Sequence, residues 1–102
     1  MISQPHKANP YLNQKVMSAS PEQLICYVYD VAVASCRRKD KIKSIQAMNV
    51  LIKSLKFDYH EIASNFYRVY SAILDKISSE AYEDAESMLS ELRETWVKAM
   101  SL

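Results

Sequence analysis

Glycine is absent from all 102 residues of this chain. Glycine usually makes up about 7% of a protein and serves positions with positive φ, such as the tight turns of β-hairpins. A chain without glycine is poorly suited to hairpins, and this one is well supplied with strong helix formers such as Ala, Leu, Met, Glu, Lys and Gln. We therefore expect an all-α domain.

Hydrophobic periodicity divides the chain into an N-terminal arm and four helices. Ser20, Pro21 and Gln23 form the sequence pattern of a capping box with proline at the first helical position. Apolar residues then recur at spacings of three and four, which predicts helices over residues 21–38, 40–56, 59–78 and 80–100. Such short connections require antiparallel neighbours. We expect an up-down four-helix bundle as one domain over residues 21–102, with residues 1–20 as a loosely held arm or short helix.

Charge and hydropathy exclude two classes of partner. The net charge is +1, so no strong field attracts nucleic acid or an anionic membrane. The bundle topology also brings the basic residues 37–41 close to the acidic residues 80–86. We therefore expect these opposite charges to compensate each other partly at that end of the bundle. The most apolar run, residues 24–34, is short and contains Asp30, so we expect no membrane insertion.

The cysteines and the N-terminus predict a cytoplasmic protein. Cys26 and Cys36 lie in an apolar stretch without metal-ligand neighbours, as free thiols do in a reducing compartment. The first residues lack the apolar segment of a signal peptide. The chain also lacks paired histidines, a Glu-x-x-His motif, a glycine-rich phosphate loop and a histidine partner for either cysteine. We expect no enzymatic activity, no metal and no cofactor.

The first long helix is more apolar than folding requires. At 100° per residue its continuous polar stripe is limited to Gln23, Asp30 and Arg37, whereas a surface helix needs an apolar stripe only a little over about 100° wide. The helical wheel predicts that one set of residues faces the core: Leu24, Val28, Val31, Ala32 and Ser35. A second set continues the apolar surface round one side: Ile25, Cys26, Tyr29, Val33 and Cys36.

Two interpretations of this second set stay open. The helix can be a central one, covered by two neighbours and by residues 11–17 of the arm. It can also form a groove with the edge of the second helix, in which an amphipathic partner helix docks. The tyrosines suit an interface because each combines apolar area with a polar tip. The candidate partner-binding residues are therefore Tyr11, Ile25, Cys26, Tyr29, Val33, Cys36, Leu51, Leu55 and Tyr67.

Several fragments, in order along nearly the whole chain, resemble the FliS family of flagellar secretion chaperones. They are Asn9-Pro10-Tyr11, VMSASPEQLI at 16–25, Tyr29-Asp30, Phe57-Asp58-Tyr59, Glu61-Ile62-Ala63, FYRVY at 66–70 and LRETW at 92–96. The resemblance implies a bacterial cytoplasmic helical bundle that binds the disordered C-terminal segment of flagellin. Such a chaperone prevents premature polymerisation and aids flagellar type III secretion, which makes an export-gate protein a further expected partner.

The chain departs from the family pattern at two places. Val31 stands where the family usually has glycine after the Tyr-Asp pair, and no Gly-Gly turn precedes Glu61. The first two long helices are also shorter than is typical, which changes the expected length of the groove. The alternative function is a structural helical module that forms a weak homodimer, or binds another helix, through the same apolar surface.

Overall fold

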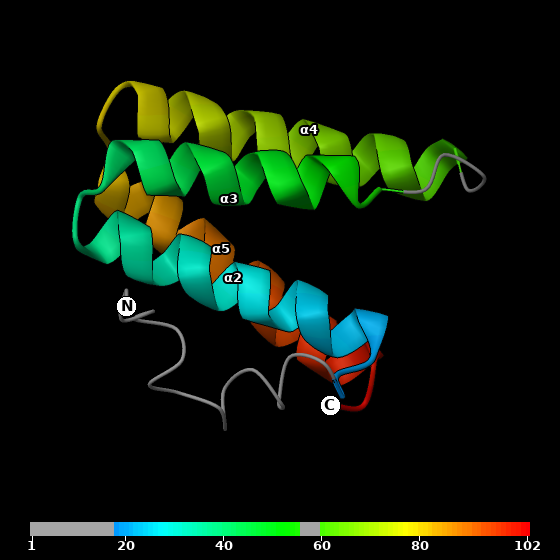
Figure 1. The fold of residues 1–102 in the computed structure, drawn as a ribbon. Helices are drawn as coiled ribbons and strands as arrows, with labels where there is room; N and C mark the ends of the chain where they lie inside the picture. Colours follow the sequence, from blue (N-terminus) through cyan, green and yellow to red (C-terminus); the bar gives the residue numbers. More distant parts are fainter. Residues whose placement is uncertain (1–17, 56–59) are drawn as a thin grey trace, which may run out of the picture.

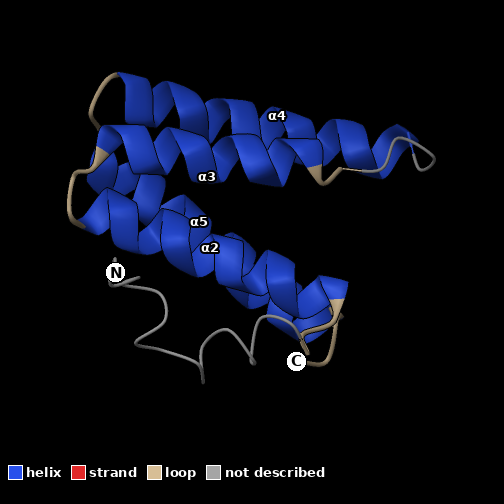
Figure 2. Cartoon of the chain, viewed as in Figure 1, coloured by secondary structure: helices blue, strands red, loops and turns tan. Residues whose placement is uncertain are grey.

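The computed structural model describes residues 18–55 and 60–102, and these form four helices and no strand. With the labels of Figure 1, the helices are α2 (Pro21–Arg37), α3 (Lys41–Lys53), α4 (His60–Ser78) and α5 (Tyr82–Ala99). Figure 2 shows helices joined by short loops at 38–40 and 79–81. The four predicted helices are confirmed to within a few residues, while residues 1–17 of the predicted arm lie outside the described residues.

The helices run up and down in a closed ring, as the sequence predicts for an all-α bundle. Each helix packs against its neighbour in sequence, and α5 returns to pack against α2. Figure 1 shows two pairs, α2 with α5 and α3 with α4, which meet where the turns at 38–40 and 79–81 lie and move apart toward the other end. We call these two ends the closed end and the open end.

Side-chain caps set the starts of α2 and α3. The backbone N–H of Gln23 donates to Ser20 Oγ at 3.2 Å, and the Ser20 N–H donates to Gln23 Oε1 at 2.9 Å, which completes the predicted capping box. At α3, the N–H of Lys43 donates to Asp40 Oδ1 at 3.1 Å. Each cap stabilises its helix by about 1 kcal/mol.

Three helix ends adopt a left-handed backbone without glycine. The residues with positive φ are Lys39 at 58°, Glu80 at 62° and Ser101 at 54°. At the first of these the N–H of Asp40 donates to the carbonyl of Ser35 at 2.8 Å, which is the long bond of a Schellman motif. Glycine is favoured at this position because it has no Cβ to clash with the backbone. Both turns of the closed end therefore contain a strained residue.

The core is densest toward the closed end and thins toward the open end. Its buried members are Tyr29, Ala32, Cys36, Ala47, Met48, Leu51, Tyr70, Ile73, Ile77, Tyr82, Ala85 and Leu89. Nearer the open end the large side chains are only half-buried, among them Ile25, Leu55, Phe66, Leu92 and Trp96. Between α2 and α3 at the closed end the Cys36 thiol donates to Ser44 Oγ at 3.7 Å, so two small side chains allow these two helices to approach closely.

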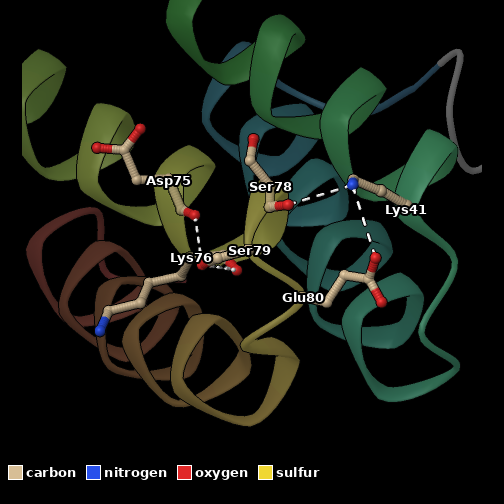
Figure 3. Close-up of polar contacts among 6 residues, drawn as sticks. All are labelled: Lys41, Asp75, Lys76, Ser78, Ser79 and Glu80. Carbon is tan, nitrogen blue, oxygen red and sulfur yellow. Dashed lines mark hydrogen bonds and ion pairs between the residues drawn. The ribbon is translucent and has the colours of Figure 1, made fainter.

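Polar contacts hold each end of the bundle. At the closed end Lys41 Nζ donates to the carbonyl of Ser78 at 3.2 Å and lies 3.9 Å from Glu80, as Figure 3 shows. At the open end the indole N–H of Trp96 donates to the carbonyl of Glu22 at 2.9 Å, which joins the end of α5 to the start of α2. The predicted approach of basic residues 37–41 to acidic residues 80–86 is confirmed by these contacts at the closed end.

Candidate partner-binding surface

The structure places the nine predicted site residues in different environments. Cys26, Tyr29, Cys36 and Leu51 are buried, whereas Ile25, Val33 and Leu55 are half-buried. Tyr67, on α4, is 49% exposed, and Tyr11 lies outside the described residues. A partner can reach the four buried residues only if helices separate. The exposed apolar surface of α2 is therefore formed by other residues.

The wheel prediction for α2 is right for part of the helix and wrong for the rest. Ala32 and Ser35 are fully buried as predicted, but Leu24 and Val31, also predicted to be inside, are 39% and 49% exposed. Tyr29 and Cys36, predicted to lie on the side surface, are among the most deeply buried residues of the bundle. The helix is rotated by about a quarter turn from the predicted orientation, at 100° per residue.

Two contacts with α5 accompany this rotation. The Arg37 guanidinium lies 2.7 Å from Glu86 Oε2, and Arg93 of α5 forms an ion pair with Asp30. The polar stripe of α2 therefore follows its boundary with α5 instead of the middle of a solvent-facing surface. A helix turned in this way directs Tyr29 into the core and leaves Leu24 and Val31 facing outward.

These residues form one face of α2, on the side away from α5. Leu24, Val28 and Val31 follow each other at spacings of four and three, so they lie along one line of the helix. The neighbour of α2 on that side is α3. The helical wheel alone places these residues in the core, because it contains no information about which neighbour receives the polar stripe.

Val50 of α3 borders the same surface. Lys41 contacts the end of α4, and Val50 lies nine residues later, half a turn round the helix at 100° per residue. It therefore faces away from α4 and toward the α2 side, and it is 48% exposed. We call the surface formed by Leu24, Val28, Val31 and Val50 the α2–α3 strip.

Burial suppresses the acid–base chemistry of the core. Burial raises the pKa of the Cys36 thiol, with a smaller opposing effect from its hydrogen bond to Ser44. A buried thiol with a raised pKa is a poor nucleophile. The pKa values of Tyr29 and Tyr70 are raised too, first because burial disfavours the phenolate. All three groups are uncharged at neutral pH and act in packing.

The described residues also contain few features of a small-molecule site. No group of three or more His, Cys, Asp or Glu among them could hold a metal ion, and none of their helices is long and apolar enough to cross a membrane. A hollow of about 250 Å³ lies at the turn into α5 and is bordered mainly by charged residues: Lys39, Glu80, Ala81, Tyr82, Glu83 and Asp84. Ligand pockets are mostly larger and apolar.

Comparison of the chain with known protein families, with curated proteins and with solved structures finds no match. The α2–α3 strip exposes the aliphatic side chains of Leu24, Val31 and Val50 on a bundle that already has a buried core.

Proposed function

We propose that this protein is a cytoplasmic export chaperone that binds the disordered C-terminal segment of flagellin. The observation that carries the proposal is the α2–α3 strip. Leu24, Val31 and Val50 are exposed and Val28 is half-buried although the bundle has a core of its own, so the strip is available to a partner. Contiguous apolar surface of this kind is typical of protein interfaces.

The geometry of the strip suits an amphipathic helix. Leu24, Val28 and Val31 form an apolar line along α2, against which the i, i+3 and i+4 anchors of such a helix can pack. The half-buried Ile25 and Leu55 extend the apolar area toward the open end. A segment that folds as it binds can cover a large surface at modest affinity, which suits a chaperone that must later release its client.

The resemblance to the FliS family supports the same client. Its fragments extend from Asn9 to Trp96 and include the first half of α2, where Leu24 lies. Val31, at the place where the family usually has glycine, adds aliphatic area to the strip. While this protein holds the flagellin segment, flagellin would not polymerise before export. Contact of this protein with an export-gate protein is part of the same proposal.

Isothermal titration calorimetry with a flagellin C-terminal peptide tests the proposal. We expect binding with a negative change in heat capacity, because apolar surface is buried. Val31→Asp should weaken binding at least tenfold, since a carboxylate would be desolvated beneath the partner, which costs more than the roughly 1.4 kcal/mol of a tenfold change.

Ala72→Asp is the control, because Ala72 is exposed on α4, away from the strip, and the change introduces the same carboxylate. It should leave the affinity unchanged. Absence of binding by the unmodified protein at about 100 µM peptide would reject the proposal.

Self-association through the strip is the second candidate function. Two copies could cover Leu24, Val31 and Val50 of each other, which are otherwise exposed. Sedimentation of the unliganded protein distinguishes the candidates. A dimer that Val31→Asp dissociates favours the structural module, and a monomer that binds the peptide favours the chaperone.

A further inference from the structure

We propose that the helix bound on the α2–α3 strip carries acidic residues along the edge that lies over α3, where Arg38, Lys43 and Lys53 receive them. The inference rests on the proposed function in using the same strip. It adds the charge pattern of the partner helix, which determines the edge of that helix that lies over α3. The inference concerns the chemistry of the bound helix and applies to any protein that supplies one.

The net charge of +1 conceals a strong separation of charge along the chain. Residues 37–53 contain six Lys or Arg and one Asp, whereas residues 75–94 contain seven Asp or Glu and two Lys or Arg. Helix α3 has three lysines and no carboxylate, and α5 is predominantly acidic. Since α2 packs between α3 and α5, one side of α2 is basic and the other acidic. The strip lies on the basic side.

Two cations continue the lines of the strip toward the closed end. Arg38 follows Val31 by seven residues, and Lys43 precedes Val50 by seven, so each lies on the face of its aliphatic neighbour. Both are exposed, and neither forms an ion pair within residues 18–55 and 60–102. The carboxylate of Asp40, between them in sequence, is engaged as the cap of α3.

Lys53 provides a cation toward the open end. It is exposed, three residues after Val50, so Lys43 and Lys53 bracket that valine. Ten residues of α-helix separate them by about 15 Å along the axis. An antiparallel or parallel partner helix would meet both lysines with carboxylates spaced by about three turns.

The opposite edge of the strip does not compete for these cations. Asp30, on the α2 side, is paired with Arg93 toward α5. Exposed ion pairs contribute only a few-fold each to affinity, so the aliphatic strip supplies most of the binding. Charge placement instead selects the partner and fixes which edge lies over α3.

Two designed amphipathic peptides with the same aliphatic face test the inference. One carries Glu along the edge expected over α3, and the other carries Lys there. The unmodified protein should bind the Glu peptide about tenfold more tightly in low salt, and the preference should shrink as salt screens the exposed charges.

The matched variants change the net charge equally. Lys43→Glu with Lys53→Glu alters the strip, and Lys76→Glu with Lys98→Glu alters exposed lysines of α4 and α5 that form surface ion pairs. Circular dichroism checks that both proteins are folded. The first pair should abolish or reverse the preference for the Glu peptide, and the second should retain it.

Equal affinity for the two peptides, binding of neither, or an equal response of the two variants would overturn the inference. Failure of the proposed function gives a different result. If the Glu peptide binds with the expected preference and the flagellin segment does not bind, the client is wrong and the charge pattern stands. If flagellin binds and Lys43→Glu with Lys53→Glu leaves both its affinity and the peptide preference unchanged, the charge pattern is wrong and the client stands.

Discussion

The hydroxyl groups of Tyr29 and Tyr70 lie 2.7 Å apart inside the core, where one donates a hydrogen bond to the other. This bond allows two polar atoms to be buried between α2 and α4. Loss of one hydroxyl would leave the other unpaired, which costs about 1–3 kcal/mol, whereas replacement of both is close to neutral. At the scale of residues, a tyrosine on the apolar side of α2 therefore serves packing.

The tyrosine pair predicts a specific double-mutant cycle. Tyr29→Phe or Tyr70→Phe alone should lower the free energy of unfolding by about 1–2 kcal/mol, and the double variant should recover most of this loss. Urea denaturation at neutral pH measures all three. Equal and additive losses would contradict the buried bond.

The same pair predicts a loss of stability in alkali. Burial raises the folded-state pKa of both tyrosines above the ordinary value of 10.0. Their contribution is thus complete below about pH 10 and is lost as the pH rises further, because the unfolded state releases its protons first. Urea denaturation between about pH 9 and pH 11 should show a steeper loss for the unmodified protein than for the double Phe variant. Equal slopes would place the hydroxyls in water.

At the scale of elements, the helices were predictable and the orientation of α2 was not. The start of α2 follows from Ser20, Pro21 and Gln23, which act within one turn of the chain. Its rotation places Asp30 and Arg37 beside Arg93 and Glu86, which lie 63 and 49 positions away in sequence. A wheel drawn for one helix contains no information on such distant partners.

The absence of glycine also has a consequence at this scale. Lys39 ends α2 in the left-handed region, which disfavours a residue with a Cβ by about 1–2 kcal/mol. Lys39→Gly should raise the free energy of unfolding by about 1 kcal/mol, because the Schellman turn keeps its hydrogen bonds and loses the strain. Lys39→Ala retains a Cβ and should bring no such gain. Thermal denaturation compares the two, and an equal effect would contradict the left-handed turn.

At the scale of the whole molecule, stability and binding are separated along the bundle. More of the buried core lies toward the closed end, where Cys36 of α2 contacts Ser44 of α3. Toward the open end, large side chains such as Phe66 and Trp96 are half-buried, and the α2–α3 strip remains exposed. The bundle can therefore fold on its own and still offer apolar surface to a partner.

The sequence predicted part of this arrangement. The excess of apolar residues on α2 predicts that this helix has more apolar surface than the core requires. The exposure of Leu24 and Val31 agrees with that interpretation. Four of the nine predicted residues, Cys26, Tyr29, Cys36 and Leu51, belong to the core instead, because a wheel for one helix contains no information about its neighbours. Which apolar side of a helix is exposed is decided by its neighbours.

The central claim is that the α2–α3 strip binds the C-terminal segment of flagellin. Methyl NMR of the protein during titration with that segment tests it most directly, because each aliphatic side chain reports on its own surroundings. The methyl signals of Leu24, Val31 and Val50 should shift with the degree of saturation, while the signal of Leu74, half-buried on α4, should stay in place. Saturating binding that shifts Leu74 and leaves the strip unchanged, or no shift at any of these methyls, would contradict the account.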